Sequence, residues 1–171
     1  IRALLRDLDV DLFSPQELDL MRNIKEDGET YRENAALKAK AYAKASGLFS
    51  LADDSGLEVV ALEGAPGLYS ARYAPVSNPT DRDRRQYLLK NLEYHPRPWK
   101  ARFRCVAAFS SPDGDIHYTE GVCPGEIIPE ERGEHGFGYD PIFLLPQKGR
   151  TMAELSMYEK NQLSHRALAI Q

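Results

Sequence analysis

The sequence predicts an α/β fold built on a long mixed β-sheet with flanking helices. Helix-like and strand-like segments alternate along the chain, which favours a layered α/β architecture. One pair of strand-like segments is separated only by a tight turn, and this hairpin makes the sheet mixed rather than wholly parallel. The chain has 171 residues, of which 42% are hydrophobic, enough for one core and short for two. We therefore expect a single domain, residues 1–171.

The first segment, IRALLRDLDVDLFS (1–14), has the pattern of the end of an amphipathic helix followed by a short strand. No residues that could start that helix precede it. We therefore expect the natural chain to begin further upstream.

The next segment, ETYRENAALKAKAYAKASGL (29–48), predicts a helix. Thr30 and Glu33 have the spacing of a capping box, the alanine-rich body favours helix, and Gly47 suits its C-terminal end. Strand-like residues 48–52 and 56–62 then flank an Asp-Asp-Ser-Gly corner. The carboxyl ends of strands are where α/β sheets bind ligands, so we expect this corner to lie at a ligand-binding edge.

The rest of the chain continues the alternation. TDRDRRQYLLKNL (80–92) predicts a helix whose charges form a solvated face, and we assign it no chemistry. Strand-like residues 101–110 and 116–128 are joined by SPDG, in which Pro112 and Gly114 suit a reversing turn. Residues 151–170 look helical, with Ser156 and Glu159 again at capping-box spacing.

The composition excludes several classes of protein. The formal charge of −4, from 26 acidic and 22 basic residues, lacks the positive field that a nucleic-acid polymer needs. Cys105 and Cys123 each lie in a strand-like run, which predicts buried thiols in a reducing compartment. No apolar stretch is long enough to span a bilayer and no signal peptide is visible, so we expect a cytoplasmic protein with no membrane partner.

Acidic residues form the first group that could carry chemistry. Glu26, Asp53 and Asp54 offer the oxygen ligands that Mg²⁺ prefers, and such a site often uses only one or two protein carboxylates. The alternative is equally strong from sequence alone, because Asp-Asp-Ser-Gly is also good turn chemistry. Glu26 by itself fits an ordinary surface residue.

Basic residues form the second group. Lys38 lies one helical turn after Asn34, so both side chains can point the same way, and Arg72 follows the small residues of YSARY. A polyphosphate needs such cations at its non-bridging oxygens. Taken separately, each fits an ordinary surface charge or salt-bridge partner.

The segment GFGYDPIF (136–143) is the third group. Its two glycines allow the ring of Phe137 to be presented on a flexible backbone, with Tyr139 as a second ring nearby. Asp140 offers an acceptor before Pro141 fixes the chain. Stacking on a nucleobase, typically worth about 1–3 kcal/mol per base, would explain these residue types. The alternative is a loop with core aromatics.

The fourth group is Lys160 with Ser164, His165 and Arg166. On one uninterrupted helix, Lys160 and His165 would be about 140° apart and would not face one ligand from the same side. Either the helix breaks near Ser164, which could cap a new start, or these residues contact different parts of a long ligand. A cationic helix C-terminus favoured by the helix dipole is the alternative.

Four stretches together resemble one enzyme family closely. They are GETYRENAALKAKAYAKASGL, LADDSGLEVVALEGAPGLYSARY, GFGYDPIF and ELSMYEKNQLSHRALA. The chain resembles the inosine triphosphate pyrophosphatase family, enzymes that cleanse the nucleotide pool of non-canonical purine nucleoside triphosphates. The resemblance covers nearly the whole chain. It implies an elongated α/β fold with a long mixed sheet, two lobes and a cleft between them, assembled as a homodimer.

The resemblance also assigns roles to residues of this chain. It implies Asp54 as the acidic catalytic residue and Glu26 as the second metal-binding carboxylate. Its substrate contacts fall on Lys38, Ser55, Phe137, Gly138, Tyr139, Asp140, Lys160, His165 and Arg166. The family also has an N-terminal strand and a triphosphate-binding loop, which would lie upstream of Ile1.

With this resemblance, the residues suggest a mechanism. Glu26 and Asp54 would hold Mg²⁺, or Mn²⁺ as an alternative ion, and the metal would bridge phosphate oxygens. Asp54, aided by Asp53, would deprotonate a water molecule aimed at the α-phosphorus. Lys38 would stabilise charge on the departing pyrophosphate.

Selectivity for ITP, dITP and XTP would follow from donors on Arg166, His165 or backbone N–H groups to the keto oxygen at purine position 6. Two other classes of function stay open. One is a different metal-dependent phosphatase, and the other is a non-catalytic nucleotide-binding module.

Overall fold

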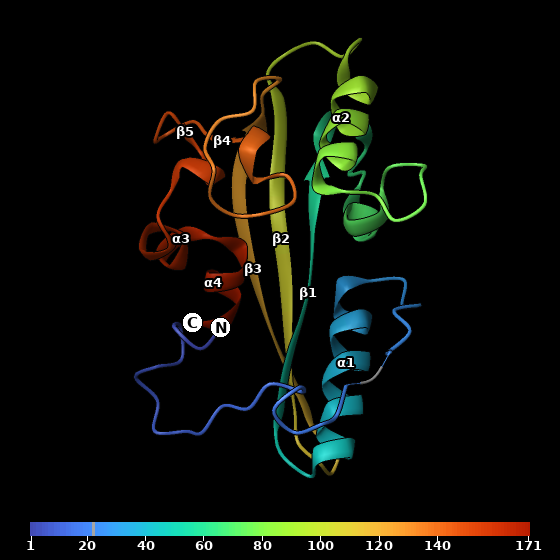
Figure 1. The fold of residues 1–171 in the computed structure, drawn as a ribbon, viewed down its shortest axis with the longest axis vertical. Helices are drawn as coiled ribbons and strands as arrows, with labels where there is room; N and C mark the ends of the chain where they lie inside the picture. Colours follow the sequence, from blue (N-terminus) through green and yellow to red (C-terminus); the bar gives the residue numbers. More distant parts are fainter. Residues whose placement is uncertain (22) are drawn as a thin grey trace. The chain divides into compact units, whose positions relative to one another are not determined.

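The computed structural model describes residues 1–21 and 23–171, and it shows helices around one β-sheet (Figure 1). The five described strands lie in the sheet in chain order: β1 (Ser50–Val59), β2 (Trp99–Ser110), β3 (Ile116–Ile127), β4 (Phe143–Leu145) and β5 (Arg150–Thr151). The described α-helices are α1 (Tyr31–Ser46), α2 (Asp81–Leu92), α3 (Met157–Leu163) and α4 (His165–Ile170). Short 3₁₀-helices are η1 (Val60–Leu62), η2 (Gly67–Arg72), η3 (Asp140–Ile142) and η4 (Met152–Glu154).

The α/β class is confirmed, and the expected hairpin is the β2–β3 pair. The sheet differs from the expected one in strand direction, because its described strands form an antiparallel sheet rather than a mixed one. Alternation of helices and strands favours parallel pairing only where each helix carries the chain back across the sheet. Here short turns join β2 to β3 and β4 to β5, as is typical of antiparallel neighbours, and β4 returns antiparallel to β3 after a longer connection that contains η3.

The chain divides into two compact units. The first unit comprises Ile1–Ser55, Cys105–Gly121 and His165–Gln171, and the second comprises Gly56–Arg104 and Val122–Ser164. Each unit contains part of β1, β2 and β3.

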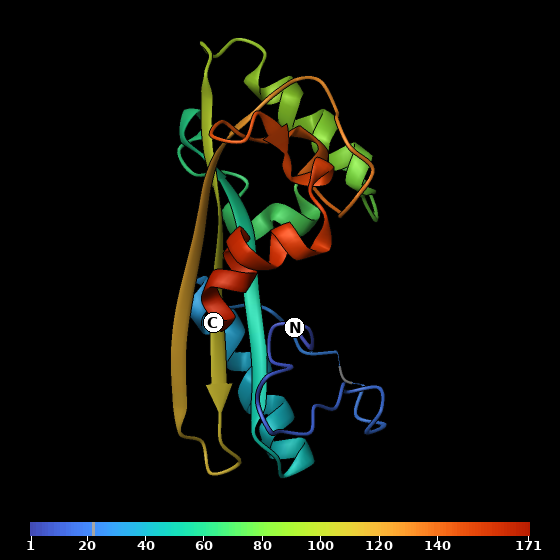
Figure 2. The same cartoon turned by 90° about the vertical axis from the view of Figure 1, so that its left-hand side faces the viewer.

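Small side chains make up the core of the first unit. Ala35 and Ala39 of α1 pack against Ala108 of β2, and both views show α1 running alongside the first half of β1 (Figures 1 and 2). At the C-terminus, α4 lies against β3 so closely that a Cβ on Gly121 would collide with backbone atoms of His165 and Ala169. Alanine and glycine are therefore needed here because they let helix and sheet backbones approach.

Larger side chains make up the core of the second unit. Its fully buried residues include Leu88 and Leu92 of α2, and the rings of Phe103 and Phe143 pack with centroids 4.4 Å apart. The two buried residues of α2, Leu88 and Leu92, are thus one helical turn apart, as the amphipathic pattern predicts.

The expectation for residues 1–14 is wrong, because among them the structure has turns and extended chain without a helix or strand. Isolated turns form instead, in which the N–H groups of Leu4 and Leu5 donate to the carbonyl of Ile1 and that of Leu8 donates to the carbonyl of Leu5. Leu8, Val10 and Phe13 remain more than half exposed. A short helix is marginal unless its apolar face packs on something, and these side chains do not bury theirs.

The expected corner at residues 53–56 is also wrong, because β1 continues through LADDSGLEV without a break. Aspartate and glycine are rare in strands, and their presence suggested a turn. Pairing within the sheet outweighs that local preference. Successive side chains of a strand point to opposite faces, so Asp53 and Asp54 are separated by the sheet rather than forced together.

Most local predictions for the helices are confirmed. Thr30 and Ser156 form the expected capping boxes, and Gly47 ends α1 in the left-handed conformation. The C-terminal helix does break at Ser164, whose backbone is extended between α3 and α4. Both cysteines are buried thiols.

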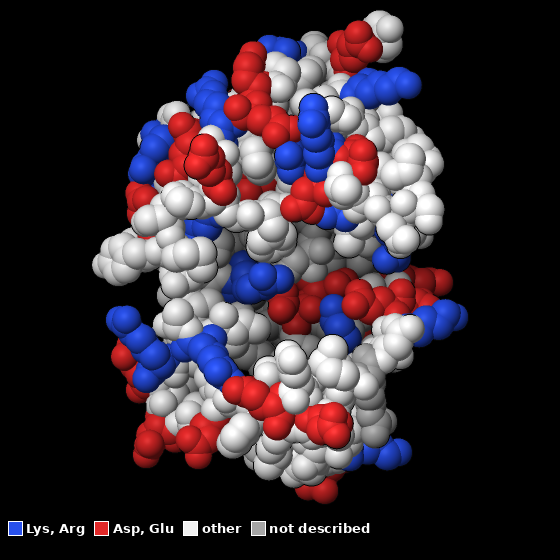
Figure 3. Space-filling view, viewed as in Figure 1, with Lys and Arg blue, Asp and Glu red and all other residues white. Residues whose placement is uncertain are grey.

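The surface agrees with the near-balanced charge. On the face drawn in Figure 3, acidic and basic side chains are intermingled. Within the part of the chain that the structure describes, no helix is both long and apolar enough to cross a membrane.

Candidate active site

Asp54 is the centre of a polar cluster in the first unit. Its carboxylate accepts a hydrogen bond from Lys38 Nζ at 3.2 Å and one from Asn34 Nδ2 at 3.3 Å. Lys38 and Asn34 are one turn apart on α1, so the i, i+4 spacing delivers both donors to the same carboxylate. The side chain of Asp54 is only 13% exposed, which makes these charge-assisted contacts strong.

Glu26 faces the same ammonium group as Asp54. Its Oε1 lies 3.4 Å from Lys38 Nζ, while Asp54 Oδ1 lies 3.2 Å from it. Two hard oxygen donors thus converge on one cationic position, and Mg²⁺ commonly takes one or two protein carboxylates and fills its other positions with water or phosphate. Among residues 1–21 and 23–171, no group of three or more His, Cys, Asp or Glu side chains could hold a metal. Glu26 and Asp54 together offer two carboxylates at one position, the number that a magnesium ion commonly takes from a protein.

Asn34 holds the cluster together, although the sequence analysis gave it no role of its own. It is 2% exposed, and its Oδ1 accepts from the backbone N–H of Gly28 at 2.9 Å while its Nδ2 donates to Asp54. One amide thereby links the segment that carries Glu26 to both α1 and β1. The spacing of Asn34 and Lys38, one helical turn apart, already places Asn34 on the same face of the helix as Lys38 and so could have predicted its role.

The environment of Asp54 raises its pKa above the ordinary value for aspartate. Burial is the largest cause, because it disfavours the charged form, and the nearby charge of Glu26 acts in the same direction. Lys38 and Asn34 oppose the rise by stabilising the carboxylate. A carboxylate with a raised pKa is a better proton acceptor than an ordinary one, which suits a general base.

Asp53 belongs to a second set of contacts in the first unit. Its Oδ2 accepts from Arg166 Nε at 3.0 Å and from Ser55 Oγ at 3.0 Å, and Cys105 Sγ lies 3.7 Å away. Burial, with the charge of Asp53 adding to it, raises the pKa of Cys105 to about 12, so this thiol stays protonated. Asp53 therefore fixes the guanidinium of Arg166.

His165 starts α4 next to Arg166. Burial lowers its pKa to about 4, and the neighbouring positive charge of Arg166 acts in the same direction. The imidazole is consequently neutral near pH 7, with one ring nitrogen as a donor and the other as an acceptor. A neutral ring can donate to a keto oxygen without adding a charge.

The aromatic loop lies in the second unit. We define it as residues 136–140. The ring of Phe137 is 65% exposed, whereas Tyr139 is 4% exposed and its hydroxyl donates to the carbonyl of Ser70 at 2.9 Å. Tyr139 is thus a core ring that anchors the loop, and burial raises its pKa. Phe137 is the ring that the loop presents to solvent.

Asp140 and Lys160 form a buried ion pair beneath this loop. Lys160 Nζ donates to Asp140 Oδ2 at 2.8 Å, and the same oxygen accepts from the backbone N–H of Phe137 at 3.3 Å. Burial raises the pKa of Asp140 and Lys160 opposes that rise. A Cβ at Gly136 would collide with both charged groups, so this position requires glycine. The pair therefore determines the shape of the loop.

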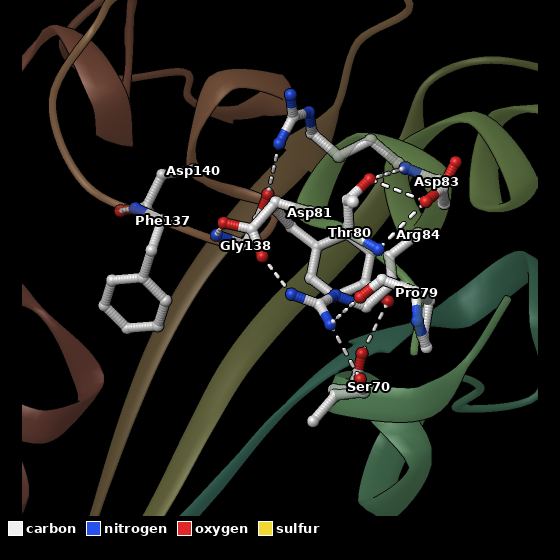
Figure 4. Close-up of polar contacts among 12 residues, drawn as sticks. Ser70, Pro79, Thr80, Asp81, Asp83, Arg84, Phe137, Gly138 and Asp140 are labelled. Atoms are coloured by element: carbon white, nitrogen blue, oxygen red, sulfur yellow. Dashed lines mark hydrogen bonds and ion pairs between the residues drawn. The ribbon is translucent and has the colours of Figure 1, made fainter. Parts of the chain in front are cut away.

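Helix α2 also holds the aromatic loop, through hydrogen bonds to Gly138. No chemistry was expected of this helix from its sequence. Asp81 accepts from the N–H of Gly138 (Figure 4). Arg85 donates to the carbonyl of Gly138. These residues were missed because a run of charges on an amphipathic helix normally forms a solvated face. Arg72 is exposed at the end of η2, with its guanidinium 5.0 Å from the centre of the Tyr69 ring.

The predicted residues fall into two groups, one in each unit. The first unit contains Glu26, Lys38, Asp53, Asp54, Ser55, His165 and Arg166. The second unit contains Arg72, Phe137, Gly138, Tyr139, Asp140 and Lys160.

Comparison with known proteins identifies the family of this chain. The sequence profile described as the Ham1 family matches residues 1–171. A protein from Desulforamulus reducens named dITP/XTP pyrophosphatase is 51% identical, over 86% of this chain and 73% of that protein. The structure of a HAM1 protein from Coxiella burnetii superimposes with a TM-score of 0.90 at 45% identity, covering 99% of this chain and 86% of that one.

A second solved structure gives the same result. The Ham1 protein of Staphylococcus aureus has a TM-score of 0.88 and 43% identity, again covering 99% of this chain and 86% of that one. The match of sequence and of fold extends over essentially the whole chain. This chain belongs to the Ham1 family.

Proposed function

We propose that this protein hydrolyses non-canonical purine nucleoside triphosphates, ITP, dITP and XTP, to the nucleoside monophosphate and pyrophosphate, and so cleanses the nucleotide pool. The relatives named dITP/XTP pyrophosphatase, at about half identity over most of the chain, support the reaction. The observation in the structure that carries the proposal is the convergence of Glu26, Asp54 and Lys38. Two carboxylates and one ammonium group at one place suit the chemistry of a polyphosphate.

Asp54 is proposed to act as the general base. Its Oδ1 is held by Lys38 and its Oδ2 by Asn34, so the carboxylate is fixed in place before a substrate binds. It would orient a water molecule and take its proton as the water attacks the α-phosphorus. Pyrophosphate leaves and the nucleoside monophosphate remains, so no covalent enzyme intermediate is needed.

Lys38 is proposed to stabilise the charge that develops on the leaving pyrophosphate. Its side chain is 20% exposed, and its ammonium group already lies within 3.4 Å of two carboxylates, which positions it. Pre-positioned charges of this kind are the largest contribution expected in phosphoryl transfer. Asp53 would assist by holding Arg166 and Ser55 in place.

Mg²⁺ is the proposed cofactor, with Mn²⁺ as an alternative, and Glu26 and Asp54 would hold it. When bound, the ion would neutralise negative charge on the phosphate oxygens. Both carboxylates already contact one cation, Lys38, which supports their role as a pair.

The nucleoside is proposed to be recognised by aromatic stacking and by hydrogen-bond donors. Phe137 would stack on the purine base, since its ring is exposed while Tyr139 and Asp140 of the same loop are buried. Neutral His165 and cationic Arg166 would donate to the substrate, and a keto oxygen accepts such bonds where an adenine amino group cannot. Ser55, Arg72, Gly138 and Lys160 remain proposed substrate-binding residues.

The proposal is tested by measuring pyrophosphate release from ITP, dITP, XTP, ATP and GTP with and without Mg²⁺, together with phosphate release from a simple phosphate ester. We expect release from the first three nucleotides, dependent on the metal and abolished by EDTA. Preference for the simple ester would instead indicate another metal-dependent phosphatase. Nucleotide binding without turnover would indicate a binding module.

Two further expectations belong to this proposal. We propose a homodimer in the cytoplasm, acting on free nucleotides and not on a nucleic-acid polymer or membrane. Light scattering of the purified protein tests the dimer.

A further inference from the structure

Side chains of α2 bond both backbone polar groups of Gly138, its N–H and its carbonyl oxygen. Its N–H donates to Asp81 Oδ2 at 2.7 Å, and its carbonyl accepts from Arg85 Nη1 at 2.8 Å. Gly138 has a φ of +60°, so the chain turns sharply at this point. Both partners lie more than fifty residues away in the sequence, and they are charged, which makes these bonds stronger than bonds between neutral groups.

Each of these two side chains is itself held by further contacts. The other oxygen of Asp81 is ion-paired with Arg84, whose guanidinium also donates to the carbonyls of Ala71 and Pro79. Arg85 makes a bidentate pair with Glu131, with both N···O distances 2.9 Å, and its side chain is only 11% exposed. These contacts restrain the side chains of Asp81 and Arg85, and so the two hydrogen bonds that they make to Gly138 are held in place.

The ring of Phe137 is next to this held stretch of backbone. Phe137 directly precedes Gly138 and is 65% exposed, and Figure 4 shows its ring directed away from the polar contacts of Asp81 and Arg84. The backbone is held on both sides of the ring's attachment point, by Asp140 at the N–H of Phe137 and by Asp81 and Arg85 at Gly138, so these bonds set the direction in which the loop carries the ring. Removing Asp81 or Arg85 would release one of these two hydrogen bonds between the turn and α2.

We infer that Asp81 and Arg85 are positioning residues for nucleotide recognition, because they hold the aromatic loop in the conformation that presents Phe137 to a purine base. This inference deepens the proposed function and rests on it, since it requires that Phe137 stacks on the substrate. Neither side chain touches the substrate in this scheme. A preorganised ring binds more tightly because less conformational freedom is lost on binding.

The test is a double-mutant cycle measured with ITP. In Asp81→Ala we expect KM for ITP to rise about 5- to 30-fold with kcat within about threefold, because part of the stacking contribution is lost while the chemistry is unchanged. In a Phe137→Ala background the same substitution should change KM less than about twofold, since no ring remains to be positioned.

A second variant and a matched control keep the test decisive. Arg85→Met removes the donor to Gly138 but keeps an apolar stem, and it should reproduce the KM effect and its dependence on Phe137. Arg82→Met changes an exposed arginine of the same helix and should leave KM unchanged. Circular dichroism tests whether each variant is folded. If Asp81→Ala does not fold, the double-mutant cycle is measured with Arg85→Met instead.

The outcomes are distinct. An equal rise in KM with and without Phe137, a fall in kcat that matches the rise in KM, or no effect of either substitution would overturn the positioning role. Failure of the unsubstituted protein to hydrolyse any purine triphosphate would instead overturn the proposed function itself.

Discussion

Asp53 and Asp54 are adjacent in the sequence and bind different cations. Asp54 Oδ1 accepts from Lys38 of α1 at 3.2 Å, and Asp53 Oδ2 accepts from Arg166 of α4 at 3.0 Å. The alternation of side chains along β1 directs the two carboxylates to opposite faces of the strand. Two like charges that looked costly side by side are therefore each paired with a cation of their own.

Replacing each aspartate by asparagine should separate their roles. Asp54→Asn should lower kcat for ITP by about 10²–10⁴-fold, because the proposed general base is lost, while nucleotide binding persists. Asp53→Asn should chiefly raise KM, because Arg166 loses its charged partner. Steady-state kinetics and binding calorimetry measure the two effects. Retained turnover in Asp54→Asn would rule out Asp54 as the base.

Removing the ammonium of Lys38 should strengthen metal binding while it weakens catalysis. In Lys38→Met, Glu26 and Asp54 lose their shared cation, so added Mg²⁺ should raise the melting temperature more than it does in the unsubstituted protein. Glu26→Gln in the same background should reduce that shift. Lys40→Met, an exposed lysine on the same helix, is the control. An equal shift in all variants would place the metal elsewhere.

His165 should make the protein less stable in mild acid. Its pKa in the folded state is about 4, below the ordinary value of 6.5, so between these values the unfolded chain binds a proton that the folded chain does not. Stability is therefore unaffected by this group above pH 6.5 and is lost as the pH falls toward 4, by up to about 3 kcal/mol. Denaturant unfolding of the protein and of His165→Gln measures the effect. The same pH dependence in both would contradict it.

Gly136→Ala should destabilise the second unit. A Cβ there would collide with the buried Asp140–Lys160 pair, and the φ of +96° is unfavourable for alanine. We expect a loss of at least about 2 kcal/mol. Gly149→Ala is the matched control, since its φ is +62° and no atom lies near the added Cβ, so only about 1 kcal/mol should be lost. Equal losses would show that the ion pair yields to the extra methyl group.

Short-range signals predicted the helices well because their physical causes are local. The capping boxes at Thr30 and Ser156 and the glycine end of α1 involve groups at most four residues apart. The same is true of the break at Ser164. Local patterns gave wrong predictions for residues 1–14 and for the Asp-Asp-Ser-Gly segment of β1. In these segments packing or strand pairing decides the conformation.

The sequence by itself determined the α/β class, the caps at Thr30, Gly47 and Ser156, and the kinds of side chain that a polyphosphate site needs. Only the tertiary structure decided which groups meet. Lys38 lies 16 residues from Asp54, and Arg166 lies 113 residues from Asp53. Arg85 reaches Gly138 across 53 residues. Contacts of this range form only when the core brings distant segments together, so spacing along the chain carries no trace of them.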